Sequence, residues 1–294
     1  MSNSIQASVI ITAHSKPNRL RLTLAGIFGQ SSCCNFEIII VADGATKTVW
    51  QVIEESKQGR KLRVISSPSL GRAGARNLGA MHAKGAVLIF VDDDILVEGD
   101  FVQQHILEQQ QHPGLVKGQL REAVGLLKVE DPAIGGVGCK PISEQELLAG
   151  KWRSTGVRLV QNALEHAAES QDGFNAPWLA SAGANLSISK QHWQQAGKFD
   201  ESYGTRWGLE DLDFGFRVYQ VGLQITLSNK ARGVHMSHPQ ANRWEQQCLN
   251  LWRFQQKVSS PEAKALPFLL SETGSLAKFK ARVHQIRQEA IPLS

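Results

Sequence analysis

Long apolar runs are absent from this 294-residue sequence. A membrane-spanning helix needs roughly 20 consecutive apolar residues, and no segment approaches that length. The apolar stretch at residues 9–12 is also far too short for the core of a secretory signal peptide. These absences favour a cytoplasmic protein with at most peripheral membrane contact.

Cysteine is scarce, and the spacing of the four cysteines argues against both a disulfide framework and a structural zinc site. Two of the four cysteines are adjacent, none forms a C-x-x-C pair, and no histidine interleaves with them at zinc-site spacing. Adjacent cysteines fit poorly into a regular disulfide framework. We therefore expect reduced thiols and no structural zinc.

Runs of like charge are missing as well. The 32 Lys and Arg residues exceed the 27 Asp and Glu residues, and both kinds are spread along the chain. A net charge of +5 suits phosphorylated ligands, an anionic acceptor or an anionic surface. Without a basic cluster, nucleic-acid binding has little support.

What the first hundred residues do contain is a regular alternation of two periods. Short runs rich in Ile and Val alternate with segments whose apolar residues recur at helical spacing. Strands are predicted at residues 7–12, 36–42, 62–66 and 86–91, and helices at 17–29, 46–59 and 71–83. This order predicts a doubly wound parallel sheet with right-handed crossovers. Ligands bind such sheets at the carboxyl ends of the strands.

The second half is less regular. The glycine-rich stretch at 119–140 gives no clear assignment. We expect a helix over 143–169, an extended segment over 178–189, helices over 191–197 and 210–221, and further helices after about residue 240.

Two features at predicted strand ends suggest ligand contacts, although each has a structural alternative. Asp43 ends a buried strand, where it could accept a hydrogen bond from a base or ribose, or cap a helix. The segment 71–79 is not a P-loop, because no G-K-[ST] closes it. Its small residues permit either close approach of a ligand or close packing of a helix on the sheet. Arg76 within it could contact phosphate or neighbouring carboxylates.

Three consecutive carboxylates, Asp92, Asp93 and Asp94, follow the last strand of the first half. They repel one another unless a positive group neutralises them. A hard divalent cation that also binds phosphate oxygens is the economical answer. The alternative is a solvated acidic turn, which fits poorly directly after an apolar strand.

A second acidic cluster, W-G-L-E-D-L-D, spans residues 207–213. Acids that open a helix stabilise its N-terminus, which is the plain structural explanation. However, an aromatic ring beside carboxylates is also a surface on which sugars stack. Further along, His235 and His238 are three residues apart and could complete a metal sphere with Asp94.

Taken in order, these pieces resemble the inverting glycosyltransferases of family 2 and their GT-A relatives, including the galactosyltransferase and N-acetylgalactosaminyltransferase groups. The resemblance covers about residues 8 to 240. The matching segments are S-V-I-I-T at 8–12, V-A-D-G at 41–44, G-R-A-G-A-R-N at 71–77, F-V-D-D-D at 90–94, A-G-A-N-L-S-I-S at 182–189, F-D-E at 199–201 and W-G-L-E-D-L-D at 207–213.

The resemblance implies a role for each candidate residue. Donor-binding residues would be Ala13, Asp43, Arg76, Asp92 and Asp93, with Asp43 at the uracil or ribose of a UDP-sugar. Metal ligands would be Asp94, His238 and, as the alternate, His235, with Mn²⁺ or Mg²⁺ as the ion. Asp211 would be the catalytic base, Glu210 would hold a sugar, and Trp207 and Gly208 would contact the acceptor.

The same resemblance implies an α/β GT-A fold, with a mixed, mostly parallel sheet flanked by helices and a C-terminal helical extension. Residues 1–111 would form the nucleotide-sugar-binding half, 112–240 the acceptor-binding and catalytic half, and 241–294 the extension. The chain departs from the pattern at T-A-H-S, residues 12–15, where many relatives have P-T-Y-N. It also lacks the Q-x-x-R-W element of processive synthases, which favours transfer of a single sugar.

The predicted function is metal-dependent transfer of one sugar from a UDP-sugar to a glycan, lipid-linked or small-molecule acceptor. Two alternatives stay open. One is a non-catalytic nucleotide-sugar-binding protein on the same fold, and the other is a metal-dependent nucleotidyltransferase. The latter should carry a glycine-rich, lysine-containing loop near residues 12–19, which has no glycine. A glycoside hydrolase would need two carboxylates and no metal, which the acidic triple does not suit.

Overall fold

The computed structural model describes residues 4–30, 34–57, 62–124, 143, 145, 146, 149, 151, 157–170, 175–238 and 242–290. Most of the unassigned stretch 119–140, and most of the part of the predicted helix 143–169 that precedes residue 157, lie outside the described residues.

The predicted alternation in the first half is confirmed, with every boundary within two residues of the prediction. The strands are β1 (Ala7–Ala13), β2 (Phe36–Asp43), β3 (Leu62–Ser67) and β4 (Val87–Asp92). The helices are α1 (Pro17–Phe28), α2 (Lys47–Lys57) and α3 (Gly71–His82). All four strands pair in parallel, in the order β3-β2-β1-β4.

The second half extends the same sheet. Its elements are β5 (Ile95–Val97), α4 (Phe101–Gln111), β6 (Gly114–Val124), β7 (Arg158–Gln161), α6 (Ala163–Glu169), the 3₁₀ turn η3 (Pro177–Ser181), β8 (Leu186–Ser189), α7 (Lys190–Gln195), the 3₁₀ turn η4 (Glu201–Tyr203), α8 (Glu210–Gln220) and β9 (Gln224–His235). Within the described residues, the strand order is β3-β2-β1-β4-β8-β6-β9-β5, with β7 beside β6. The expected mixed sheet flanked by helices is therefore confirmed.

Two predictions for the second half were partly wrong. Residues 158–161 form strand β7 rather than helix, because they pair antiparallel with the end of β6. The segment predicted as extended over 178–189 begins with the turn η3 and becomes a strand only at Leu186. Pro177 at the start of η3 favours this helical turn, because proline fixes φ near its helical value.

Side chains of the parallel strands alternate between two cores, as the pleat requires. Odd-numbered residues of β1, such as Val9 and Ile11, pack with α1, α2 and α4. Ile10 faces the opposite side and packs with α3, α7 and α8. Both faces of the sheet are covered, which explains why these strands are almost entirely apolar.

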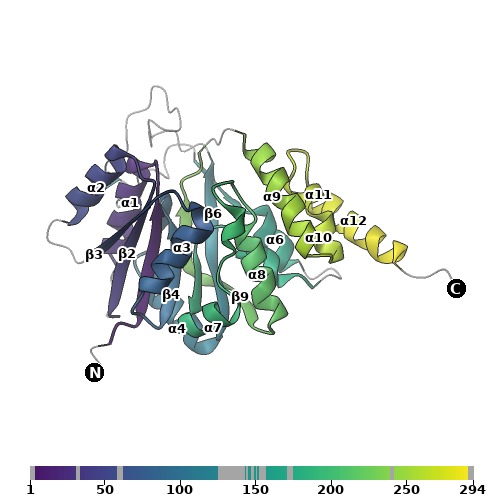
Figure 1. Ribbon diagram of the computed structural model, residues 1–294, viewed down its shortest axis with the longest axis horizontal. Helices are drawn as coiled ribbons and strands as arrows, with labels where there is room; N and C mark the ends of the chain where they lie inside the picture. Colours follow the sequence, from purple (N-terminus) through teal and green to yellow (C-terminus); the bar gives the residue numbers. More distant parts are fainter. Residues whose placement is uncertain are drawn as a thin grey trace.

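Helices α9 (Arg243–Lys257), α10 (Pro261–Ala265), α11 (Pro267–Leu270) and α12 (Leu276–Glu289) form the predicted C-terminal helical extension. In Figure 1 they lie at the end of the molecule opposite α2 and β3. Their apolar residues share a core with α6, η3 and the start of α8, through Phe254 and Trp178 among others. Among the described helices, none combines the length and apolar character that crossing a bilayer requires.

His105 of α4 gives the fold a pH-dependent contribution to stability. Its ring is fully buried and bonds to Ser187 Oγ at 2.9 Å and Asn185 Oδ1 at 2.7 Å. Burial, only partly offset by the bond to Asn185, lowers the pKa of His105 to about 4. The unfolded chain, with its higher histidine pKa, takes up the proton first as the pH falls. Stability is therefore complete above about pH 6.5 and is lost as the pH drops toward 4.

We expect the free energy of unfolding to lose about 2 kcal/mol through His105 between about pH 7.5 and pH 5. The measurement is urea unfolding of the wild type and His105→Gln at both pH values. His105→Gln should have a lower free energy of unfolding than the wild type at about pH 7.5, but that free energy should fall less between about pH 7.5 and pH 5. Equal losses in the two proteins would show that His105 does not titrate in this way.

Candidate active site

The candidate donor-binding residues lie at one edge of the sheet, at the carboxyl ends of β2, β1 and β4. These three strands are neighbours, and their register pairs Ala13 with Ala42 and Thr12 with Asp92. Ala13 and Asp92 end their strands, and Asp43 ends β2. The edge predicted from the alternation therefore brings Ala13, Asp43 and Asp92 together.

Asp43 lies between the end of β2 and the start of α3. Its Oδ1 accepts hydrogen bonds from Ser67 Oγ at 2.7 Å and Leu70 N–H at 2.6 Å, and Oδ2 accepts one from Gly71 N–H at 2.9 Å. The carboxylate thus caps the first turn of α3 from a neighbouring strand. Its role at a base or ribose stays a prediction.

Arg76 connects the two acidic clusters. Its guanidinium donates to Asp92 Oδ1 at 3.0 Å and to Glu210 Oε1 at 2.9 Å, and its side chain is only 3% exposed. The glycine-rich helix α3 permits this placement because it packs closely on the sheet. A Cβ at Gly79 would lie 2.4 Å from Ile10 Cγ2. Close packing therefore explains part of the small-residue pattern, while Arg76 serves the carboxylates.

The two partners of Arg76 respond differently to the shared guanidinium. Burial alone would raise the pKa of Asp92, but Arg76 lowers it below its usual value. The pKa of Glu210 is raised by burial and by the charge of Asp211, which together outweigh Arg76. Glu210 Oε2 is buried and has no hydrogen-bond partner within the described residues, so its capacity to accept a hydrogen bond is unused.

We expect Arg76→Met to lower the free energy of unfolding by about 3 kcal/mol, because the buried carboxylate of Glu210 and the partly buried one of Asp92 would lose their counter-charge. Urea unfolding at neutral pH measures the change. Arg76→Lys keeps the positive charge but not the two-pronged guanidinium. Its free energy of unfolding should lie between those of the wild type and Arg76→Met. A loss below about 1 kcal/mol for Arg76→Met would mean that Asp92 and Glu210 do not depend on the guanidinium.

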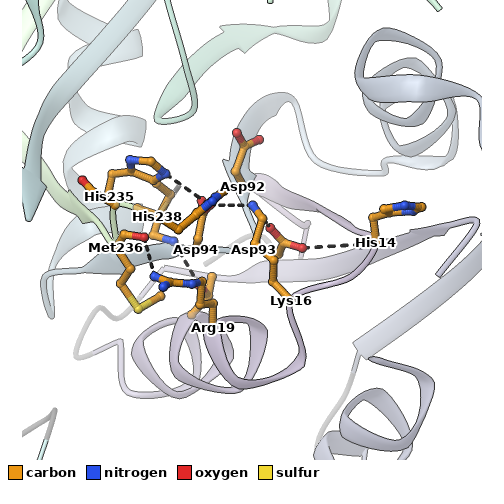
Figure 2. Close-up of polar contacts among 12 residues, drawn as sticks. His14, Lys16, Arg19, Asp92, Asp93, Asp94, His235, Met236 and His238 are labelled. Carbon is orange, nitrogen blue, oxygen red and sulfur yellow. Dashed lines mark hydrogen bonds and ion pairs between the residues drawn. The ribbon is translucent and has the colours of Figure 1, made fainter. Parts of the chain in front are cut away.

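Asp94, His235 and His238 form the second half of the site. They are brought together because β5, directly after Asp94, pairs with the end of β9 so that Ile95 lies opposite His235. Met236 N–H also donates to Asp94 O at 2.9 Å. Nε2 of each histidine lies 3.2 Å from Asp94 Oδ2. Figure 2 shows both imidazoles converging on this carboxylate.

Lys16 neutralises the acidic triple from the other side. Its Nζ lies 3.0 Å from Asp93 Oδ1 and 2.6 Å from Asp94 Oδ2 (Figure 2). Burial alone would raise the pKa of Asp94, but Lys16 and the two histidines hold it well below its usual value. Burial also raises the pKa of Asp93, where Lys16 only partly compensates.

Glu122 of β6 orients His235 from behind. Its Oε2 lies 2.6 Å from His235 Nδ1 and accepts a bond from Ser237 Oγ at 2.7 Å. Burial alone would lower the pKa of His235, but Asp94 and Glu122 raise it to about 10. A carboxylate on the far nitrogen of a metal-binding histidine fixes the ring and directs Nε2 at the ion.

These residues fit a divalent cation. One oxygen of Asp94 and one nitrogen of each histidine all lie within 4.8 Å of one another. Asp94 Oδ1 is buried and has no hydrogen-bond partner in the part of the chain that the structure describes. A carboxylate with two imidazoles suits Mn²⁺, and a cation here would replace the Lys16 ammonium on Asp94. Metal binding itself stays a prediction.

Asp211 stands at the start of α8 with its carboxylate held by backbone groups. Its Oδ2 accepts from Gly183 N–H, and Oδ1 accepts from Leu212 N–H at 2.8 Å. The side chain is mostly buried but still reaches the surface, with 9% of the residue exposed. A fixed carboxylate with access to solvent can receive a proton from a bound hydroxyl.

Trp207 and Gly208 precede α8 and contact helix α9. Asn250 Nδ2 donates to Gly208 O at 2.9 Å, and the Arg243 guanidinium carbon lies 4.1 Å from the centre of the half-buried Trp207 ring. Gly208 has φ +88°, which glycine adopts at low cost. The α8 and α9 helices thus hold this loop beside Glu210, and its contact with an acceptor stays a prediction.

Three residues of the site were missed by the sequence reasoning: Lys16, Glu122 and Gly183. Lys16 follows the T-A-H-S departure at residues 12–15, which was a signal in itself. Gly183 lies inside the A-G-A-N-L-S-I-S segment, where a glycine before a strand indicates an unusual turn. Glu122 carried no signal, because its strand was not predicted.

Comparisons with known proteins find glycosyltransferases along most of the chain. Residues 8–132 match the model of glycosyl transferase family 2, and residues 165–239 match that of the N-terminal domain of galactosyltransferase. The uncharacterized glycosyltransferase YfnE of Bacillus subtilis is 26% identical over 264 residues, covering 80% of this chain and 66% of YfnE. Validoxylamine A glucosyltransferase of Streptomyces hygroscopicus subsp. jinggangensis is 27% identical over 245 residues, covering 79% of this chain and 55% of that protein.

Residues 8–132 therefore match family 2 glycosyltransferases, and the matches along the rest of the chain are to glycosyltransferases as well. The chain spans about two thirds of YfnE and about half of the validoxylamine enzyme. Among solved structures, S. aureus TarS 1–349 superposes with a TM-score of 0.60 at 15% identity, covering 97% of this chain and 74% of that one. This likeness shows the GT-A fold of the family 2 domain.

Proposed function

We propose that the protein is a family 2 glycosyltransferase that transfers one sugar from a UDP-sugar to an acceptor hydroxyl, with inversion and with a divalent cation. The observation that carries the proposal is the Arg76 bridge. It joins Asp92, at the strand end beside the Asp94–His235–His238 cluster, to Glu210, which adjoins the carboxylate of Asp211. A diphosphate-binding edge and a proton acceptor are thereby held in one site.

The donor is proposed from both the site and the solved relatives. The TarS structures include complexes with UDP and with UDP-GlcNAc. In this chain, the equivalent edge would hold the nucleotide at Ala13 and Asp43, and the diphosphate near Asp92 and Asp93. The scarce cysteines are compatible with the cytoplasm, where we place the reaction.

The chain's own residues account for the bond changes. Asp211 takes the proton from the acceptor hydroxyl, whose oxygen forms a bond to the anomeric carbon as the bond to the diphosphate breaks and UDP leaves. A single attack from the face opposite the diphosphate inverts the anomeric centre. Glu210 Oε2 can accept a hydrogen bond from a sugar hydroxyl.

A cation bound by Asp94, His235 and His238 would stabilise the negative charge on the departing diphosphate. Mn²⁺ is the proposed ion, with Mg²⁺ as the alternative. Lys16, which also pairs with Asp93, would give up its contact with Asp94 to the ion, and its ammonium would still add positive charge to the edge where that diphosphate would lie.

The acceptor class is proposed as a glycan, a lipid-linked saccharide or a small molecule. Relatives include the validoxylamine enzyme and the chondroitin synthase of Escherichia coli, which is 24% identical and covers 79% of this chain and 35% of that protein. An aromatic platform at Trp207, beside Glu210, would suit a sugar ring on the acceptor.

The test is UDP release from a panel of UDP-sugars, with and without Mn²⁺. Slow transfer to water exposes the donor even when the acceptor is missing. Release that needs Mn²⁺ and favours one donor would support the proposal and name the sugar. If nothing is released, calorimetric titration with UDP and Mn²⁺ decides. Binding would favour a non-catalytic role or an acceptor requirement, and no binding would refute the proposal.

A further inference from the structure

Lys117 is a buried charge that the proposed reaction does not use. It lies on β6, is only 1% exposed, and pairs with Glu165 of α6 at 3.1 Å. Its ammonium also donates to Ala182 O at 3.1 Å and to Ala184 O at 2.8 Å. Two of the ammonium protons therefore bind carbonyl oxygens, and Glu165 supplies the counter-charge. A buried ion pair costs desolvation that an apolar side chain of the same length would avoid.

The two carbonyls that Lys117 binds flank Gly183, whose N–H donates to Asp211 Oδ2. Ala182 O and Gly183 N–H belong to the same planar peptide group, and in a trans peptide they point in opposite directions. Lys117 therefore donates to the carbonyl oxygen of this peptide, and Asp211 accepts from its N–H. Rotation of the peptide would break both contacts at once.

This peptide is one that can rotate. Ala182 has φ −61° and ψ 131°, and Gly183 has φ +79°, as at the central positions of a type II turn. Turning the central peptide over converts such a turn to type I, in which the third residue has negative φ. Glycine allows both forms, so the local sequence does not choose between them.

We propose that Lys117 is a positioning residue that locks the Ala182–Gly183 peptide so that its N–H stays on the catalytic carboxylate of Asp211. The charged donor on Ala182 O also polarises the amide and strengthens its N–H as a donor. This inference rests on the proposed function, because it assigns Asp211 the role of base. Lys117 itself contacts neither the sugar donor nor the acceptor substrate.

Surrounding contacts anchor the segment on both sides of the peptide and leave its orientation to Lys117. Ser181 Oγ donates to Asp211 O at 2.9 Å, and Asn185 N–H donates to Phe90 O at 3.0 Å. Asn185 Nδ2 donates to Gln119 O and Ala231 O, each at 3.0 Å. These bonds fix the ends of the turn but do not touch Ala182 O or Gly183 N–H.

The test compares Lys117→Met with a matched control, Lys190→Met. Lys190 also donates to two backbone carbonyls, those of Met81 in the last turn of α3 and of Ala83 just after it. Neither carbonyl belongs to the Ala182–Gly183 peptide. Losing one hydrogen bond to the ionised carboxylate should move the acid limb of the kcat profile for UDP release upward by about one pH unit. It should also lower kcat about tenfold, while the donor KM changes less than about twofold.

Gly183→Ala is a second variant that perturbs the same peptide without removing a charge. An added Cβ would meet only Leu120 Cδ2 at 3.9 Å, but alanine is strained at φ +79° and favours the flipped turn. We expect the same upward shift of the acid limb. If Lys117→Met and Gly183→Ala both keep the pH profile of Lys190→Met, the proposal is wrong.

Amide hydrogen exchange separates this proposal from the proposed function. The Gly183 amide should exchange at least about tenfold faster in Lys117→Met than in Lys190→Met, whether or not UDP is released. Faster exchange together with a wild type that neither releases nor binds UDP would keep the effect of Lys117 on the Ala182–Gly183 peptide but refute the transferase role. Unchanged exchange at Gly183 would overturn the lock.

Discussion

Asp211→Asn should lower kcat for UDP release by about a thousandfold, within the range that a positioned general base contributes. An amide has the shape of the carboxylate but cannot take up the acceptor's proton. Because Gly183 and Leu212 donate to the carboxylate from the backbone, the Asn oxygen can accept from one of them, and the NH₂ group then faces the other N–H, which loses its acceptor. Steady-state kinetics with the preferred donor measure the loss.

The control for this variant is Asp200→Asn, the same substitution at the N-cap of η4, where the carboxylate pairs with Lys257. It removes no group from the site and should keep kcat within about twofold. Donor binding by Asp211→Asn should also persist, since Asp211 is assigned to proton transfer. A kcat for Asp211→Asn within tenfold of the wild type would move the base to another residue.

Asp94→Asn should abolish the Mn²⁺-dependent part of UDP release, a loss of about a hundredfold or more. The carboxylate is the negatively charged ligand of the cluster, and both histidines converge on it. An amide in its place offers a weak, neutral oxygen to the ion. Chelation of the metal from the wild type should produce the same rate as the variant.

The readout is the rate as a function of Mn²⁺ concentration, with Asp100→Asn as the control. Asp100 precedes α4 and bonds to Gln104 Nε2 at 2.9 Å, away from the cluster. It should respond to Mn²⁺ as the wild type does. If Asp94→Asn also retained full stimulation by Mn²⁺, the ion would have to bind elsewhere.

The parallel half of the fold follows from the sequence because its strands are continuous apolar runs between helical segments. Since ligands bind at the carboxyl ends of such strands, the sequence alone also predicts that Asp43 and the acidic triple share one edge of the sheet. The residues that complete the site come from strands that break this pattern. In β6, Lys117 interrupts the apolar run, and the N-K-A-R segment of β9 is largely polar.

Those two strands form because they pair with each other and with β5 and β8, which no local periodicity reveals. For the same reason, residue spacing could not predict that Glu122 contacts His235 or that Lys117 binds the carbonyls on both sides of Gly183. The histidines were found only through their order along the chain. Their convergence on Asp94 depends on the register of β5 against β9.

The most direct test of the central claim is a crystal structure with UDP and Mn²⁺, with anomalous scattering recorded at the manganese edge. We predict one strong anomalous peak bound by Asp94 and at least one of His235 and His238. The diphosphate should contact this ion, and the pyrimidine should lie at the end of β2 beside Asp43. UDP bound away from this strand edge, or a manganese peak without contact to Asp94, would contradict the account.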